Sequence, residues 1–131
     1  MWNMGKEILV VDDDAMNLRM AEFILNKNGY SVTKAESAKL ALEILREKEF
    51  DLILLDIEMP EMNGCELMEI LQQDEVLKKT PVIFLTADRS AETEEKCFQL
   101  GAEDYIGKPF IPDVMMHRVN RTLELDEYRK K

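Results

Sequence analysis

The chain has 131 residues, of which 46% are hydrophobic and 34% are charged, and its formal net charge is −10. These values indicate one globular domain with a single core, and the negative charge argues against nucleic-acid binding by this segment, because a phosphate backbone needs a basic face. No apolar stretch approaches the length of a membrane span and residues 1–6 carry no signal-peptide pattern, so we expect a cytoplasmic protein with no membrane contact.

Short apolar strands alternate with amphipathic helical patterns along the chain. We expect five strands, which cover residues 7–11, 30–35, 51–55, 81–86 and 103–107. Five helices are expected between and after them, over residues 15–28, 38–48, 64–77, 90–100 and from 112 to the end of the chain. This alternation predicts an α/β fold in which right-handed crossovers produce a doubly wound, five-stranded parallel sheet.

Three of the expected strands end directly at a functional side chain. The residues at these strand ends are Asp12, Asp13 and Asp14, then Asp56, then Thr86, with Lys108 as a fainter fourth case. In an open parallel sheet the carboxyl ends of the strands face one crevice, which is where ligands bind. We therefore expect the acids, the hydroxyl and the lysine to meet there, except that Asp14 is better explained as the N-cap of the following helix.

Such a meeting of carboxylates requires a cation. Two carboxylates about 5 Å apart repel by roughly 3 kcal/mol at an effective dielectric of about 20, so three of them cost on the order of 10 kcal/mol. That is comparable to the whole stability of a domain. Lys108 offers one ammonium, which cannot offset several carboxylates. Oxygen ligands without nearby His or Cys select a hard ion, and few protein ligands favour Mg²⁺ over Ca²⁺.

Four motifs carry a family resemblance, and together they span nearly the entire chain. They are residues 10–14 with Asn17, residues 54–60 with Asn63 and Gly64, residues 85–87, and residues 101–105 continuing to 108–110. On these motifs the chain resembles the receiver domain of two-component response regulators. The resemblance implies a flavodoxin-like receiver fold with strand order 2-1-3-4-5, whose switch point lies between the first and third strands, beside the acidic residues.

The resemblance also implies a chemical role for each residue of the crevice. Asp56 would be the phosphoacceptor, which takes a phosphoryl group from the phosphohistidine of a sensor histidine kinase or phosphotransfer protein. Mg²⁺ would be held by Asp13, Asp12, Asp56 and the backbone carbonyl of Glu58, and Lys108 would pair with Asp56 before the reaction. The protein would then be a signalling phosphoacceptor and not an enzyme, apart from catalysing its own phosphorylation and dephosphorylation.

A switch follows from the same resemblance. Thr86 would donate its hydroxyl to a phosphoryl oxygen, and Tyr105 would turn inward once Thr86 has moved. The state of Asp56 would thereby reach the surface formed by the fourth expected helix, the fifth strand and the fifth helix, which controls an output domain or partner and is a candidate homodimer interface. The resemblance further implies a cis peptide between Lys108 and Pro109.

Two readings from other classes of protein compete with a receiver. The spacing of Asp12 and Asp14 fits the Asp-x-Asp arrangement of a haloacid-dehalogenase-type phosphatase, but that class needs further acids after its lysine, and only Asp113 follows Lys108 closely. The phosphatase reading also leaves Asp56 unexplained. A flavodoxin-type FMN carrier shares the topology, but the acids of the first loop would repel the phosphate of its ligand.

The end of the chain is expected to lead away from the domain. We assign residues 1–124 to the receiver and residues 125–131 to the start of a C-terminal helical linker or tail, with an output domain following in the parent chain. An alternative is the surface tail of a single-domain regulator. A seam that pairs with a second copy would be formed by Val114, Val119, Thr122, Leu125 and Tyr128.

Overall fold

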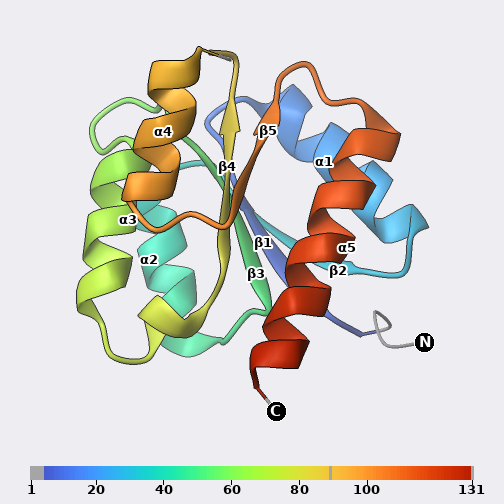
Figure 1. Cartoon of the computed structure of the whole chain (residues 1–131), viewed down its shortest axis with the longest axis horizontal. Helices are drawn as coiled ribbons and strands as arrows, with labels where there is room; N and C mark the ends of the chain where they lie inside the picture. The colour runs from blue at the N-terminus through green and yellow to red at the C-terminus, as the bar shows by residue number, and fades with distance from the viewer. Residues whose placement is uncertain (1–4, 89, 131) are drawn as a thin grey trace.

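The computed structural model describes residues 5–88 and 90–130, so residues 1–4, on which part of the signal-peptide reading rested, lie outside it. Within the described residues, five strands and five α-helices alternate along the chain (Figure 1). The strands are β1 (Glu7–Val11), β2 (Ser31–Ala35), β3 (Leu52–Asp56), β4 (Val82–Thr86) and β5 (Asp104–Gly107). All pair in parallel in the order β2-β1-β3-β4-β5, which confirms the predicted doubly wound sheet.

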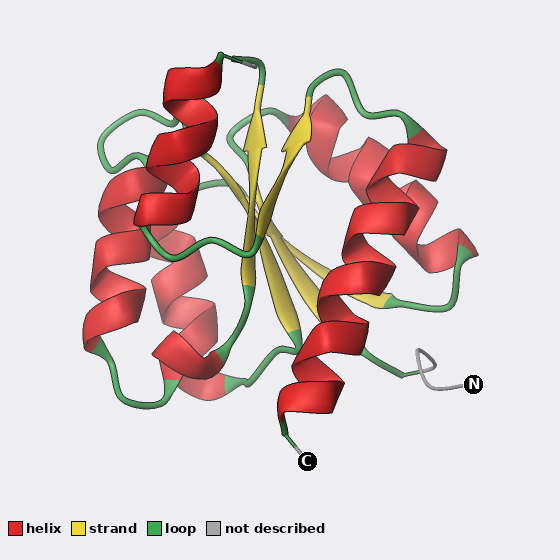
Figure 2. Cartoon of the chain, in the orientation of Figure 1, coloured by secondary structure: helices red, strands yellow, loops and turns green. Residues whose placement is uncertain are grey.

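The helices pack on both faces of this sheet. They are α1 (Ala15–Lys27), α2 (Ala38–Glu47), α3 (Gly64–Gln73), α4 (Ala91–Gln99) and α5 (Pro112–Arg129). Figures 1 and 2 show α1 and α5 on one side of the strands and α2, α3 and α4 on the other. Within the described part of the chain, no helix has both the length and the apolar character needed to cross a bilayer.

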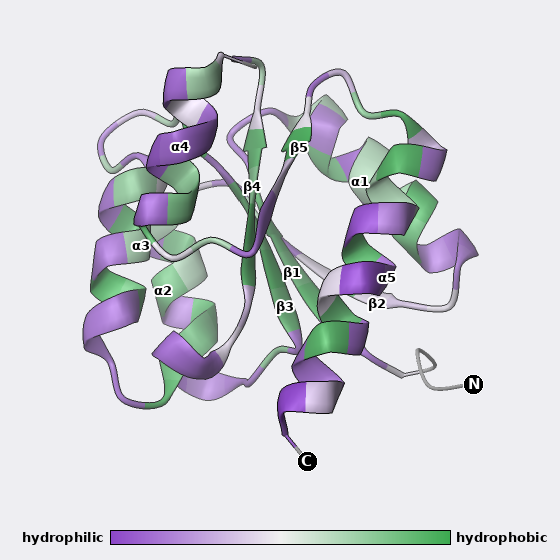
Figure 3. Cartoon of the chain, in the orientation of Figure 1, coloured by the Kyte–Doolittle hydropathy of each residue, from purple (hydrophilic) through white to green (hydrophobic). Residues whose placement is uncertain are grey.

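Alternate residues of the strands contribute to two separate cores. The face toward α1 and α5 carries Ile8, Val10, Leu52, Leu54, Ile83 and Leu85. The face toward α2, α3 and α4 carries Leu9, Val11, Ile53, Leu55, Val82 and Phe84. Burial on both faces explains why the inner strands are continuous apolar runs, which Figure 3 shows along β1, β3 and β4. The partly exposed strand β2 lies at the edge, as its interleaved polar residues predict.

Helix α3 is shorter than its sequence pattern predicts. We expected it to continue to about Leu77, but it ends at Gln73. The Asp74 carboxylate accepts hydrogen bonds from the backbone N–H groups of Val76 and Leu77, each at 2.9 Å. These bonds favour a turn over another helical turn, and the chain continues as a short 3₁₀ helix at Leu77–Lys79.

The last turns of α5 combine exposed apolar residues with ion pairs to the domain. Leu125 is 45% exposed and Tyr128 is 79% exposed, as expected for residues with little domain left to cover them. The predicted seam is wrong in its middle part, because Val119 and Thr122 are buried against the rest of the domain. The same helix end is attached to the domain through ion pairs of Lys6 with Glu127 and of Arg129 with Glu103.

Glycine is required at position 64, because the start of α3 lies very close to the backbone at the end of β3. A Cβ atom at this position would lie 2.2 Å from the carbonyl oxygen of Asp56 and 2.9 Å from Cα of Ile57. We expect Gly64→Ala to lower the free energy of unfolding by roughly 3 kcal/mol, because the atoms in the way belong to the backbone and cannot rotate aside. Urea unfolding followed by far-ultraviolet circular dichroism measures this loss.

Gly29 provides the matched control for this substitution. It has a φ of +93°, but a Cβ atom at this position would have nothing within 4 Å, so Gly29→Ala introduces backbone strain without a clash. Its cost should be about 1 to 2 kcal/mol. Equal losses for the two variants would show that the approach of the Asp56 carbonyl is not what requires glycine at position 64.

Candidate functional site

The acidic residues predicted to meet do so at the carboxyl edge of the sheet. Asp12 follows β1 and Asp56 ends β3, and these strands are neighbours with Val11 paired to Leu55. Carboxylate oxygens of Asp12, Asp13 and Asp56 lie within 4.8 Å of one another. Asp12 is fully buried and Asp56 is 3% exposed, whereas Asp13 is open to solvent.

Lys108 brings a positive charge to the two buried carboxylates. Its Nζ atom lies 2.9 Å from Oδ1 of Asp56 and 2.9 Å from Oδ2 of Asp12. The residue follows β5 directly, and its backbone N–H donates to the carbonyl of Thr86 at 2.8 Å, which fixes the start of this loop against β4. The Lys108–Pro109 peptide is cis, as the family resemblance implied.

Burial and neighbouring charges have opposite effects on the two partners of this ion pair. Burial raises the pKa of the Asp56 carboxyl from its ordinary value of 3.8 to about 6, with Lys108 opposing the rise and Asp12 adding to it. Burial alone would lower the pKa of Lys108, but its hydrogen bonds to Asp56 and Asp12 outweigh this effect and raise it. Lys108 therefore stays charged. The negative charge on Asp56 is less favourable in the folded protein without a metal than in the unfolded chain.

Local hydrogen bonds orient the Asp12 side chain and give Asp14 a different role. Oδ1 of Asp12 accepts the backbone N–H of Asp14 at 2.9 Å, and Oδ2 lies 3.4 Å from the side-chain amide of Asn17. The Asp14 carboxylate accepts the backbone N–H of Met16 at 2.8 Å and caps α1, as predicted. Asp14 therefore serves as the N-cap of α1, and the motif residue Asn17 contacts the Asp12 carboxylate.

The loop after β3 completes a cleft of about 260 Å³. Its lining includes Asp12, Asp13, Asp56, Glu58, Thr86 and Lys108. The loop is closed where Ile57 accepts the backbone N–H of Gly64 at 2.8 Å, and Asn63 caps α3 in a reciprocal capping box with Glu66. The cleft thus combines three oxygen donors suited to a hard cation with room for a phosphoryl group.

The Thr86 hydroxyl is turned toward the loop that follows β4. Its Oγ1 atom accepts the backbone N–H of Asp88 at 2.9 Å and donates to the carbonyl of Asp88 at 3.1 Å. Thr86 itself is buried at the edge of the cleft. The sequence placed this residue correctly, but the role of Asp88 as its partner was not predicted.

Tyr105 lies half-buried between α4 and α5. Its hydroxyl donates to Oε2 of Glu94 at 2.9 Å, and this hydrogen bond is the main reason that the pKa of Tyr105 is raised. The ring meets Phe98 edge-on, with centroids 6.4 Å apart, and Cζ of Arg118 lies 5.1 Å from its centroid. The sequence motifs include Tyr105, but no motif marks its partners Glu94, Phe98 and Arg118.

Comparison with known proteins identifies the class to which this fold and cleft belong. The sequence model of the response regulator receiver domain matches residues 8–120. The chain therefore belongs to the family of response regulator receiver domains of two-component systems. It is a signalling family, and the haloacid-dehalogenase alternative is not favoured.

Particular relatives agree with this assignment. The chain is 38% identical over 106 residues to the polar-differentiation response regulator DivK of Brucella ovis. The matched region covers 81% of this chain and 86% of DivK. It is 40% identical over 118 residues to the transcriptional regulatory protein CrdR of Helicobacter pylori. This match covers 90% of this chain and 55% of CrdR. A crystal structure of a putative response regulator from Chloroflexus aurantiacus superposes with a TM-score of 0.87 at 32% identity, covering 92% of this chain and 98% of that one.

Replacing Asp56 with Asn should stabilise the metal-free domain at neutral pH. Because the pKa of Asp56 is about 6 in the folded protein and near 3.8 when unfolded, the unfolded state ionises first as the pH rises. The wild type therefore loses stability relative to Asp56→Asn between about pH 4 and pH 6, and the difference is constant at higher pH. We expect a difference of about 3 kcal/mol at pH 8, measured by urea unfolding in EDTA.

Asp14→Asn is the control for the removal of one acidic charge near the cleft. Asp14 is exposed, and Asn is as good an N-cap as Asp, so this change should alter stability by well under 1 kcal/mol. Lys108 keeps Asp12 as a partner in the Asp56→Asn variant. An Asp56→Asn protein that gains no stability over the wild type between pH 4 and pH 8 would contradict the unfavourable charge on Asp56.

Proposed function

We propose that this receiver domain accepts a phosphoryl group on Asp56 from the phosphohistidine of a sensor histidine kinase or phosphotransfer protein. A carboxylate oxygen of Asp56 attacks phosphorus, the phosphorus–nitrogen bond breaks, and its electron pair remains on the imidazole, which takes up a proton. The product is an acyl phosphate. The observation that carries this proposal is the buried Asp56 carboxylate, which lies 2.9 Å from Lys108 and within 4.8 Å of two further acids.

The donor set of the cleft fits Mg²⁺. Asp13, Asp12 and Asp56 offer carboxylate oxygens, and the backbone carbonyl of Glu58 would complete the protein ligands. A bound ion supplies charge neutralisation where the phosphoryl group and the carboxylates come together. The exposure of Asp13 and the volume of the cleft support a site that keeps water ligands on the metal.

Lys108 and Thr86 act on the phosphoryl oxygens in this proposal. Lys108 leaves the Asp56 carboxylate as Asp56 is phosphorylated and pairs with a phosphoryl oxygen, while Asp12 stays within reach of Lys108. Thr86 turns its hydroxyl from Asp88 to donate to another phosphoryl oxygen. Hydrolysis of the acyl phosphate in the same cleft returns the domain to its resting state, so that its chemistry is limited to its own phosphorylation and dephosphorylation.

The switch carries this change to the face formed by α4, β5 and α5. Movement of Thr86 makes room for Tyr105 to turn inward, which changes the surface around Phe98 and Arg118. The phosphoryl group favours the switched state over the resting state, because it binds the Thr86 hydroxyl in the switched state only. This face is the one we propose to contact an output domain, a partner or a second copy.

We also propose a division of the chain in which residues 1–124 form the receiver and residues 125–131 begin a helical linker to an output domain. The family match ends at residue 120, and the chain spans 55% of the length of CrdR, a transcriptional regulatory protein. We propose a cytoplasmic location as well, in agreement with the free thiols of Cys65 and Cys97, which a reducing compartment maintains.

Incubation with acetyl phosphate and Mg²⁺ should add one phosphoryl group, at Asp56. Intact-mass measurement should show this addition in the wild type and in Asp14→Asn, and its loss in Asp56→Asn. Asp13→Asn should weaken Mg²⁺ binding in calorimetry and slow labelling by at least about tenfold, because it removes one charged ligand. Labelling at Asp12 in place of Asp56 would reject the receiver chemistry and favour a phosphatase.

Phosphorylation should promote pairing through the exposed end of α5. Sedimentation velocity at tens of micromolar should show a larger dimer fraction with Mg²⁺ and a phosphoryl mimic than without them. Leu125→Ser combined with Tyr128→Ser should remove the dimer, because these exposed residues supply apolar area for the contact. Phe23→Ser, an exposed apolar residue on α1, is the matched control, and a monomer under every condition would refute the pairing.

A further inference from the structure

The backbone of Asp88 holds the Thr86 hydroxyl in its present position. The hydroxyl accepts the Asp88 N–H at 2.9 Å and donates to the Asp88 carbonyl at 3.1 Å, so both of its hydrogen-bonding roles are used by one residue. Any rotation of Thr86 toward the cleft breaks both bonds. The position of Asp88 is therefore tied to the state of Thr86.

The side chain of Asp88 anchors the beginning of α4. Its Oδ1 atom accepts the backbone N–H of Ser90 at 2.9 Å, and Oδ2 accepts the hydroxyl of Thr93 at 2.7 Å. Ser90 is the N-cap of α4 and accepts the backbone N–H of Thr93 at 3.2 Å. The hydrogen bonds from Thr93 and Ser90 hold the pKa of Asp88 below its ordinary value, so the anchor is a charged one.

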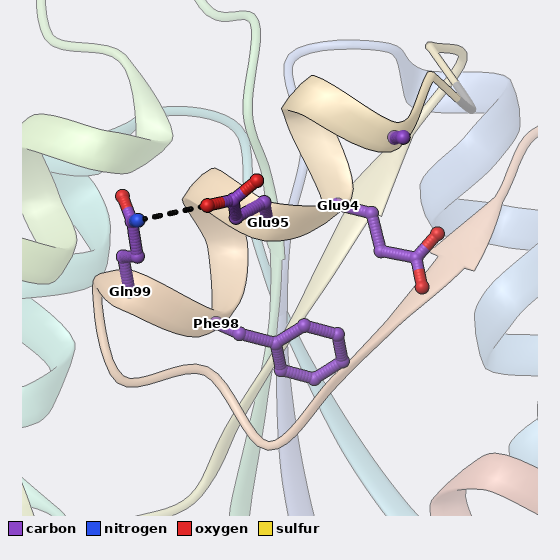
Figure 4. A pocket seen from close by; sticks show the side chains of 5 residues that line it. Glu94, Glu95, Phe98 and Gln99 are labelled. Carbon is purple, nitrogen blue, oxygen red and sulfur yellow. Dashed lines mark hydrogen bonds between the residues drawn. The ribbon is translucent and has the colours of Figure 1, made fainter.

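The next residue of α4 after Thr93 holds Tyr105. Glu94 accepts the Tyr105 hydroxyl at 2.9 Å, and Phe98, one turn later, meets the same ring. Figure 4 shows Glu94 and Phe98 on the side of α4 that faces β5, whereas Glu95 and Gln99 are bonded to each other on its other side. The outward position of Tyr105 thus depends on where the first turns of α4 lie.

Helix α4 buries little of its surface. Cys97 is the only buried residue of this fully described helix, which has nine residues and three glutamates in its first half. Short helices have little stability of their own and depend on packing and caps. Loss of a charged N-terminal anchor should therefore displace the first turn of α4 more easily than that of a well-packed helix.

We propose that the first turns of α4 form a resting-state latch between Thr86 and Tyr105, with Asp88, Thr93 and Glu94 as positioning residues. In the resting state Asp88 binds both the Thr86 hydroxyl and Thr93, and Glu94 keeps Tyr105 outward. When Thr86 turns to the phosphoryl group, Asp88 is released, its hold on Thr93 weakens, and Glu94 moves off the Tyr105 hydroxyl. The inference rests on the proposed function, because it assumes that phosphorylation of Asp56 recruits Thr86.

Two substitutions break the latch without touching the cleft. Glu94→Gln replaces a charged acceptor of the Tyr105 hydroxyl by a neutral one, and Thr93→Val removes the hydroxyl that binds Asp88 while preserving the shape of the side chain. Each should raise the ratio of inward to outward Tyr105 in the unphosphorylated protein by roughly tenfold. Glu95→Gln is the matched control, since it removes the same charge from the same turn without contact to Tyr105.

The ratio is measured by ¹⁹F NMR of protein labelled with 3-fluorotyrosine, with the Tyr105 signal assigned by Tyr105→Phe. The reference for the inward state is the wild type with Mg²⁺ and beryllofluoride, a phosphoryl mimic. We expect the signals of Glu94→Gln and Thr93→Val to move toward this reference without the mimic, and the signal of Glu95→Gln to stay in place. The double variant should move no further than the larger single shift, because both changes open one latch.

Mass measurement of Asp56 labelling by acetyl phosphate separates failure of the latch from failure of the proposed function. If wild type and all three variants are labelled equally but Glu94→Gln and Thr93→Val behave as Glu95→Gln does, the latch is wrong and the receiver chemistry stands. Additive shifts in the double variant also overturn the latch, because they mean independent effects on Tyr105. If the wild type is not labelled, the proposed function fails, and the latch fails with it.

Discussion

The repulsion among three carboxylates at one edge of the sheet is the constraint on which the rest of this structure depends. At an effective dielectric of about 20, each close pair costs roughly 3 kcal/mol. Lys108 contacts the two buried carboxylates and offsets part of this cost, whereas burial, with a smaller contribution from Asp12, raises the pKa of Asp56. The burial of the central strands on both faces supplies stability that opposes the remaining repulsion.

The strand ends and their meeting could be predicted because both follow from burial. An apolar run rich in β-branched residues indicates a buried strand, and parallel pairing alone brings the carboxyl ends together. This is why Asp12, Asp56 and Lys108 were found from the sequence. The end of α3 was not found, because Leu77 continues the apolar helical pattern while Asp74 forms local hydrogen bonds that end the helix earlier.

Contacts that depend on rotamers and on distant parts of the chain could not be predicted. A serine at the start of a helix, such as Ser90, is a local sequence signal for an N-cap. No such signal shows that the backbone of Asp88 also binds the Thr86 hydroxyl. Similarly, Glu94 belongs to a run of glutamates that resembles a solvated helix face, and only the packing of α4 on β5 selects it as the acceptor for Tyr105. Residues at the strand ends are therefore easier to predict than residues that position them.

Helix α5 has a mechanical property that follows from its two kinds of contact. Arg118 touches the Tyr105 ring near the middle of the helix, and Arg129 lies eleven residues later, about 16 Å farther along the axis at 1.5 Å per residue. A tilt of about 10° at Arg118 would displace the far end of the helix by about 3 Å. In the proposed switch, such a tilt is opposed by the packing of the buried residues Val119, Thr122 and Leu123 and by the ion pairs of Glu127 with Lys6 and of Arg129 with Glu103.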